Sequence, residues 1–247
     1  TTEIYTLSLH DALPILSTSM LAEDLKPNRL EAAKDVAAEF INGRPNDNIG
    51  ITLFAGETFT QCPLTVDHAV LLDMIHNIKC GLIEDGTAVG MGVANAVTRL
   101  KDSKAKSKVI ILLTDGTNNK GDISPLTAAE IAKSFGIRVY TIGVGTNGMA
   151  PYPYPVGNTV QYINMPVEID EKTLTQIAGT TDGNYFRATS NSKLKEVYEE
   201  IDKLEKTKLN VKEYSKREED YRWFALAAFL CVLLEVLLRN SILKKIP

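Results

Sequence analysis

The feature that most constrains the fold is a continuous apolar segment near the middle of the chain. Residues 108–114 read Lys-Val-Ile-Ile-Leu-Leu-Thr, a run of the kind found in strands that are buried on both faces of a sheet. A similar run at 49–55 follows a segment, 29–41, whose apolar residues repeat at helical spacing. Because such alternation is typical of βαβ units, the sequence predicts a three-layer α/β domain with a central, mostly parallel sheet.

The other elements follow from the same two periodicities. Helices are predicted at 29–41, 67–78, 87–100, 125–135, 169–178 and 192–204. Strands are predicted at 49–55, 59–64, 108–114, 136–142 and 184–187, with Pro63 ending the second of them. Ser124 before Pro125 is a typical helix start, and Gly90 and Gly92 allow one helix to approach its neighbour closely. An extended connector is expected at 208–214.

Composition excludes some classes of protein. The chain has 247 residues, enough for one sizeable domain and an appendage, with 27 basic and 31 acidic residues and a net charge of −4. This balance argues against a nucleic-acid-binding surface. Cys62, Cys80 and Cys231 show no CxxC spacing, so three free thiols are expected, with a Cys62–Cys80 disulfide as the alternative.

The C-terminal end has the composition of a membrane anchor. Residues 223–238 contain a single charge, Glu235, and basic residues follow this segment. A membrane-spanning helix is therefore predicted at 221–243, after a connector at 208–220. An amphipathic helix that docks on the domain or on a partner is the alternative. Long folded domains count little in the positive-inside bias, and we expect the domain to lie outside the cytoplasm.

The N-terminal end is unusual in another way. The stretch Leu-Ser-Leu-His-Asp-Ala-Leu-Pro-Ile, residues 7–15, looks like the translation of a sequencing adapter. We therefore expect residues 1–15 to be a non-native leader that replaces the true first strand, and the domain to occupy 16–207. A genuine but divergent first strand is the alternative.

Oxygen-bearing side chains follow the predicted strands at three places. Ser17 and Ser19 follow the first strand, Asp115 follows the central strand, and Thr87 lies in a loop before a helix. Loops at the carboxyl ends of parallel strands meet at one edge of a sheet, so these side chains are expected to form one site. Their oxygens suit a small hard cation such as Mg²⁺. Ile15 stands where an Asp-x-Ser-x-Ser pattern would have its first carboxylate, so the site is incomplete and metal binding is expected to be weak or absent.

A rival interpretation comes from Gly143-Val-Gly145-Thr-Asn-Gly148, which matches the GxGxxG pattern of dinucleotide-binding folds. That motif needs a helix directly after it to receive the pyrophosphate. Three prolines at 151, 153 and 155 forbid such a helix, so the nucleotide interpretation is set aside.

Several loop residues have more than one interpretation. The segment 151–157 together with Tyr162 is aromatic and stiff, and either forms a partner surface or packs down as an ordinary insertion. Asp85 either belongs to the site loop or simply forms a turn. Asn118, Asn119 and Asp122 are expected to make hydrogen bonds within their loop, with lining of the binding surface as the alternative.

The order Ser17, Ser19, Thr87, Asp115 resembles the metal-ion-dependent adhesion site of von Willebrand factor type A domains, which have a Rossmann-like fold. In that family an Asp-x-Ser-x-Ser segment, a loop Thr and a strand-end Asp surround Mg²⁺, and this chain departs from the pattern at Ile15. The segment 17–30 and the predicted C-terminal anchor are similar to the BatA-type membrane proteins of bacterial aerotolerance operons.

The resemblance implies recognition rather than catalysis. A partner's acidic side chain would complete the coordination of the ion, and we expect no enzymatic activity. Sister Bat-type proteins and a MoxR-type ATPase are implied as partners, with a role in oxygen or stress tolerance at the bacterial inner membrane. The alternative is a structural scaffold whose metal site is degenerate.

Overall fold

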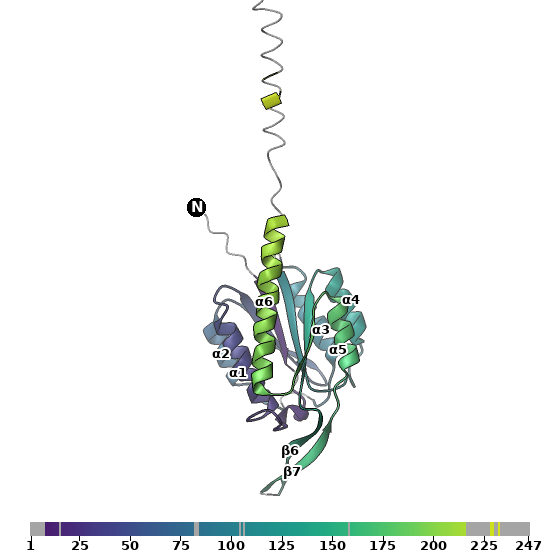
Figure 1. Cartoon of the computed structure of the whole chain (residues 1–247). Helices are drawn as coiled ribbons and strands as arrows, with labels where there is room; N and C mark the ends of the chain where they lie inside the picture. Colours follow the sequence, from purple (N-terminus) through teal and green to yellow (C-terminus); the bar gives the residue numbers. More distant parts are fainter. Residues whose placement is uncertain are drawn as a thin grey trace, which may run out of the picture. The chain divides into compact units, whose positions relative to one another are not determined.

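In a computed structural model, the chain folds into the predicted α/β domain. The structure describes residues 8–14, 16–81, 84–103, 105, 107–157, 159–215, 228–229 and 232. Two compact units are present, residues 1–204 and 205–247, and the architecture that follows concerns the first, apart from the end of the last helix, which belongs to the second. Figure 1 shows its central sheet with helices on both faces.

The sheet is mostly parallel, as predicted. Its order is β3-β2-β1-β4-β5-β8, with every neighbouring pair parallel except β2 and the edge strand β3. The strands are β1 (Ser8–Pro14), β2 (Asn48–Phe54), β3 (Thr58–Thr65), β4 (Ser107–Thr114), β5 (Arg138–Val144) and β8 (Tyr185–Ala188). The apolar strand β4 lies in the middle and is buried at nearly every position, which explains why it carries no alternating pattern.

The helices lie close to where their periodicity places them. They are α1 (Arg29–Asn42), α2 (His68–His76), α3 (Val89–Leu100), α4 (Pro125–Ser134), α5 (Glu171–Thr180) and α6 (Asn191–Ser215), with a short 3-10 helix η1 (Thr18–Leu21). Helices α1 and α2 cover one face of the sheet, and α3, α4 and α5 cover the other (Figure 1). Ser124 caps α4 as predicted, by accepting a hydrogen bond from the Thr127 N–H.

Gly90 makes the close approach that the sequence indicated. A Cβ atom at this position in α3 would lie 2.0 Å from the backbone oxygen of Ile123. At Gly92 a Cβ atom would lie 3.1 Å from the Phe54 ring. Gly90 therefore lets α3 approach the loop before α4, and Gly92 lets it approach Phe54 of the sheet.

Two expectations need correction. Strand β3 runs through Pro63 to Thr65 instead of stopping at the proline, because an edge strand tolerates a residue without an N–H. The extended connector expected at 208–214 is wrong, since α6 continues to Ser215. The Lys, Leu and Glu residues there are good helix formers, which outweighs the weak apolar pattern. Cys62 and Cys80 are free thiols, as expected.

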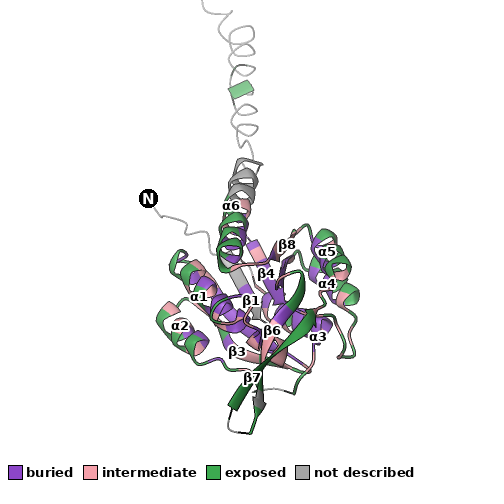
Figure 2. Cartoon of the chain, turned by 60° about the horizontal axis from the view of Figure 1, so that its bottom comes forward, coloured by how far each residue is buried: buried purple, intermediate pink, exposed green. Residues whose placement is uncertain are grey.

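The segment 151–157 has two interpretations from sequence alone, a partner surface or a packed-down insertion. It forms part of a β-hairpin, β6 (Gly148–Val156) and β7 (Thr159–Val167), which pair antiparallel as a separate two-stranded sheet. Strand β7 is exposed along nearly its whole length (Figure 2), whereas Ala150 in β6 is buried and the Pro151 oxygen accepts a hydrogen bond from the Glu23 N–H, so the hairpin contacts the domain through β6.

The predicted membrane anchor, 221–243, lies outside the described residues apart from 228–229 and 232. Within the part of the chain that the structure describes, no helix has both the length and the apolar character needed to cross a membrane. The anchor stays a prediction.

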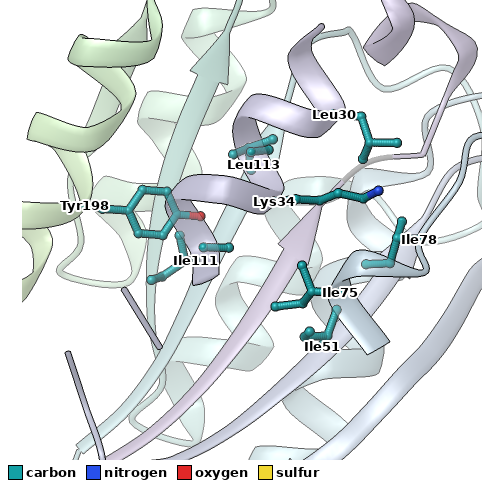
Figure 3. Close-up of a pocket in the computed structure, with 10 residues that line it drawn as sticks. Leu30, Lys34, Ile51, Ile75, Ile78, Ile111, Leu113 and Tyr198 are labelled. Atoms are coloured by element: carbon teal, nitrogen blue, oxygen red, sulfur yellow. The ribbon is translucent and has the colours of Figure 1, made fainter. Parts of the chain in front are cut away.

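A small apolar cavity lies in the part of the core that the structure describes. It has a volume of about 30 Å³ and is lined mainly by aliphatic residues, with Lys34 and Tyr198 at its margin. Figure 3 shows Lys34 among the lining side chains, with its nitrogen pointing away from Tyr198, and this nitrogen donates to Glu31 Oε1 at 2.8 Å. A space of this size holds about one water molecule, so it is a packing feature and not a ligand site.

Strand β1 is formed by residues 8–14, within the stretch that the sequence assigns to a non-native leader. It lies between β2 and β4 and carries a fully buried acid, Asp11, paired with Arg99. Burial raises the pKa of Asp11 to about 6, although Arg99 opposes this shift. A charged side chain at the centre of a sheet is unusual for a strand selected for this position.

We expect Asp11 to make the stability of the chain depend on pH in mildly acidic solution. The pKa of Asp11 is about 6 in the folded chain and 3.8 when the side chain is exposed, as in the unfolded chain. Between these pH values the folded chain therefore binds more protons than the unfolded chain. Stability should therefore fall as pH rises from about 4 to about 6, by on the order of 2 kcal/mol from this group. Urea unfolding of the chain and of Asp11→Asn at several pH values measures this slope. An unchanged slope in the variant would contradict the assignment.

Candidate metal site

The four predicted site residues lie in loops at the carboxyl edge of the sheet. Ser17 and Ser19 follow β1, and Asp115 directly follows β4. The loop of Thr87 joins the same edge, because the Ala88 N–H donates to the Ala55 oxygen at the end of β2, at 2.7 Å. This is the edge at which open α/β sheets bind ligands.

Three of the four residues are in direct contact. The hydroxyls of Ser17 and Ser19 are hydrogen-bonded to each other, and Ser19 Oγ donates to Asp115 Oδ1 at 2.9 Å. Ser17 and Asp115 are buried. Thr87 is also buried, and its hydroxyl lies 3.5 Å from where a Cβ atom on Gly116 would be. The structure therefore brings Ser17, Ser19 and Asp115 together and places the Thr87 hydroxyl beside the residue that follows Asp115.

Polar residues tie the site loops together. Asp85 accepts hydrogen bonds from the Thr18 N–H at 3.0 Å and the Thr18 hydroxyl at 2.8 Å, so it links the Thr87 loop to η1 and is more than a turn former. Burial raises the pKa of Asp85, but these two hydrogen bonds, together with one from the Gly86 N–H and the charge of Lys120, outweigh burial and hold the pKa below its usual range. Asn119 accepts from the Thr87 N–H at 2.9 Å and returns a bond from its own N–H to the Thr87 oxygen. It is the loop hydrogen-bonder that the sequence predicted.

Arg29 is a site residue that sequence reasoning missed. Its Nη1 donates to Asp115 Oδ2 at 2.8 Å, and its Nε and Nη2 donate to the two oxygens of Asp24 at 2.8 and 2.7 Å. Asp24 also accepts from the Thr146 N–H at 2.8 Å. The guanidinium is 3% exposed, so this is a buried ion triad and not a surface contact.

Arg29 controls the charge and the orientation of Asp115. Burial raises the pKa of Asp115, and Arg29 and Ser19 lower it without cancelling that effect. Arg29 donates to Oδ2, which leaves Oδ1 to accept from Ser19, whose hydroxyl is also bonded to Ser17. One signal for Arg29 was present in the sequence. A cation in the first turn of a helix is unfavourable for the helix dipole, which indicates a carboxylate partner nearby.

The donor set fits a hard cation in part. Two serine hydroxyls, one carboxylate oxygen and the nearby Thr87 hydroxyl are all oxygen donors, as Mg²⁺ prefers. The negative charge available to a cation is low, because Arg29 offsets one of the two carboxylates, Asp24 and Asp115, that it contacts. Among the residues that the structure describes, no three His, Cys, Asp or Glu side chains form a metal cluster. Ile15 lies outside the described residues.

Together, fold and site define a class: an α/β domain whose parallel sheet carries a hydroxyl-rich site at its carboxyl edge. Residues 16–200 match the family model of the von Willebrand factor type A domain, and the chain belongs to this family. Domains of this family are typically interaction modules without enzymatic activity.

Solved structures give the same result. The chain is 34% identical to the conserved hypothetical protein BatB from Bacteroides thetaiotaomicron, with a TM-score of 0.70 over 81% of this chain and 99% of that one. It is 30% identical to an aerotolerance-related membrane protein from Bacteroides fragilis NCTC 9343, crystallised with multiple substitutions to serine. There the TM-score is 0.69, over 80% of this chain and 97% of that one.

One relative is considerably longer than the segment that this chain matches. Over 199 residues the chain is 31% identical to a UPF0353 protein from Mycolicibacterium paratuberculosis. The match spans 74% of this chain and 56% of that protein. The chain therefore spans little more than half the length of this relative.

Proposed function

We propose that the chain is a membrane-anchored interaction domain that binds a protein partner through a Mg²⁺ ion at the carboxyl edge of its sheet. The supporting observation is the contact of Ser17, Ser19 and Asp115, which come from loops far apart in sequence. These three side chains and Thr87 would hold the ion. When bound, Mg²⁺ would offer an open coordination position to an oxygen from outside the chain.

The partner's contribution follows from the charge of the site. The hydroxyl ligands are neutral and Asp115 is partly offset by Arg29, so a bound divalent ion would keep a net positive charge. A carboxylate is the side chain that best matches such a centre. We therefore propose that the partner offers an Asp or Glu, and that the domain performs recognition and not catalysis.

The cellular setting is proposed from the relatives. The likeness to BatB and to an aerotolerance-related membrane protein supports a role in an envelope complex of the bacterial inner membrane. In this proposal the domain occupies 16–207, the anchor lies at 221–243, and the domain faces the periplasm. Sister Bat-type proteins and a MoxR-type ATPase are the proposed partners.

One observation favours a second function, that of a structural scaffold without metal. Arg29 already supplies a cation to Asp115, and Ile15 takes the place of the missing carboxylate. In that case the ion triad would replace the metal, and partner binding would not depend on divalent ions.

Selection from a random peptide display library separates the two functions. The full chain and its Ile15→Asp variant are each used as bait, in 10 mM Mg²⁺ and in EDTA, beside Ser19→Ala and the exposed control Ser192→Ala. The metal-bridged function predicts that Asp and Glu are enriched only in Mg²⁺, and that Ser19→Ala abolishes this enrichment while Ser192→Ala does not. Enrichment of the same peptides in EDTA would instead favour the scaffold function.

A further inference from the structure

The β6–β7 hairpin has an unusual concentration of exposed apolar side chains. Seven large hydrophobic residues on this one element are between 43% and 61% exposed: Met149, Tyr154, Val156, Val160, Tyr162, Ile163 and Met165. Single exposed apolar residues need no explanation, but a contiguous group marks an interaction surface. Figure 2 shows the exposed hairpin beside the domain, on its own separate from the main sheet.

The hairpin is fixed to the loop that carries the candidate metal site. The Glu23 N–H donates to the Pro151 oxygen at 2.9 Å, and the Tyr162 hydroxyl donates to Glu23 Oε1 at 2.9 Å. Glu23 follows η1, whose residues Thr18 and Ser19 belong to the site loop. The apolar surface therefore has a defined position relative to the site.

The outer edge of β6 is poorly suited to pairing with an added strand, because of where its prolines fall in the register. Pro151, Pro153 and Pro155 face Asn164, Tyr162 and Val160 across the ladder, so all three prolines fall in the same class of pairs. A proline without an N–H is compatible with the ladder only where its nitrogen points to the outer edge. That edge of β6 offers no donors at these positions, so strand addition there is disfavoured, and the exposed side chains on the faces of the hairpin offer another means of recognition.

One face of the hairpin closes a pocket against the site. The pocket has a volume of about 370 Å³. Tyr152 and Ile163 line it from the hairpin, and Thr18, Ser19 and Arg29 line it from the domain. Tyr152 and Ile163 are direct cross-strand neighbours, so they present one continuous apolar wall. Since Ser19 also contacts Asp115, the pocket is continuous with the candidate metal site.

We infer that this pocket receives a bulky apolar side chain of the partner, close in sequence to the acidic residue that reaches the site. This inference rests on the proposed function and names the kind of segment that the site accepts. The lining contains no acidic side chain, and its one charged residue, Arg29, is a cation that stays protonated. Arg29 is already paired with Asp24 and Asp115, so the proposed metal ion attracts the carboxylate, while the apolar wall selects an aliphatic or aromatic neighbour.

The same peptide library tests the inference with two matched hairpin variants. Ile163→Ser removes an apolar side chain from the pocket wall, and Val160→Ser removes one of similar exposure from another part of β7 that does not line the pocket. In Mg²⁺, we expect selected peptides to carry Leu, Ile, Phe or Met within three positions of the acid. A selected peptide should bind Ile163→Ser about 10–100-fold more weakly, as expected for one buried side chain, and Val160→Ser with unchanged affinity.

The outcomes distinguish this inference from the proposed function. Acidic peptides without an apolar preference, or equal losses in both variants, would overturn the pocket and leave the metal bridge standing. Apolar selection that persists in EDTA without acidic residues would overturn the metal bridge instead. Sedimentation of the full chain supplies a third outcome. A dimer that Ile163→Ser dissociates would show that a second copy fills the pocket, and would overturn the inference. Circular dichroism confirms that both variants are folded.

Discussion

Replacing Arg29 by methionine is expected to lower the free energy of unfolding by about 3–5 kcal/mol at neutral pH. The substitution keeps much of the volume of the side chain but leaves Asp24 and Asp115 without their shared cation, and both lose their charge-assisted hydrogen bonds. Asp115 is 3% exposed, so water cannot replace the guanidinium. Urea unfolding followed by circular dichroism measures the loss.

A pH series adds a readout that packing alone would not change. Burial already raises the pKa of Asp115, and without Arg29 the pKa would rise further. Protonation at acidic pH removes the unpaired charge, so the difference between the chain and Arg29→Met should shrink as pH falls. Lys193→Met, which removes an exposed ion pair with Glu196, serves as the control and should have no measurable effect. A loss that does not change with pH would contradict the buried triad.

Much of the sheet and helix framework could be predicted from the sequence, because local pattern and burial agree there. The segment 108–114 is apolar at nearly every position because both faces of this strand are buried, and burial on both faces is also what places the strand in the middle of the sheet. Likewise, Ser124 and Pro125 start α4 through hydrogen bonding and backbone geometry that concern only neighbouring residues. The shared edge of Ser17, Ser19 and Asp115 followed from strand order alone.

The hairpin could not be predicted in the same way. Three prolines in five residues normally exclude a strand, and here they are tolerated only because the register puts them all in one class of pairs. That register depends on the partner strand β7, whose exposed residues carry no buried-strand pattern. The pairing of β6 with β7 therefore outweighs the low strand propensity of the prolines, and this pairing cannot be read from the sequence of β6 alone.

Arg29 was missed for a related reason. Its partner Asp115 lies 86 residues away, and nothing in the segment around Arg29 indicates which loop it will contact. The triad also changes the expected chemistry of the site. Sequence alone counts one carboxylate and three hydroxyls, whereas the structure shows that the carboxylate is already shared with an internal cation.

Replacing Ile15 by aspartate is expected to tighten Mg²⁺ binding by about 10–100-fold. The resemblance of the Ser17 and Ser19 segment to an Asp-x-Ser-x-Ser pattern implies a carboxylate at this position, and a second negative charge in the site would offset the cation that Arg29 contributes. The number of charged oxygen ligands is what chiefly tunes such sites over decades of affinity. Asp115→Asn in the Ile15→Asp background is the matched control, since it removes the charge that the structure places against Ser19 while keeping the shape of the side chain.

Titration calorimetry with Mg²⁺ on the full chain, on Ile15→Asp and on Ile15→Asp with Asp115→Asn tests most directly whether these oxygens hold one divalent ion. We predict weak binding by the chain, one tight site in Ile15→Asp, and loss of that site when Asp115 is also replaced. Equal affinities in all three proteins would contradict a metal site built from Ser17, Ser19, Thr87 and Asp115.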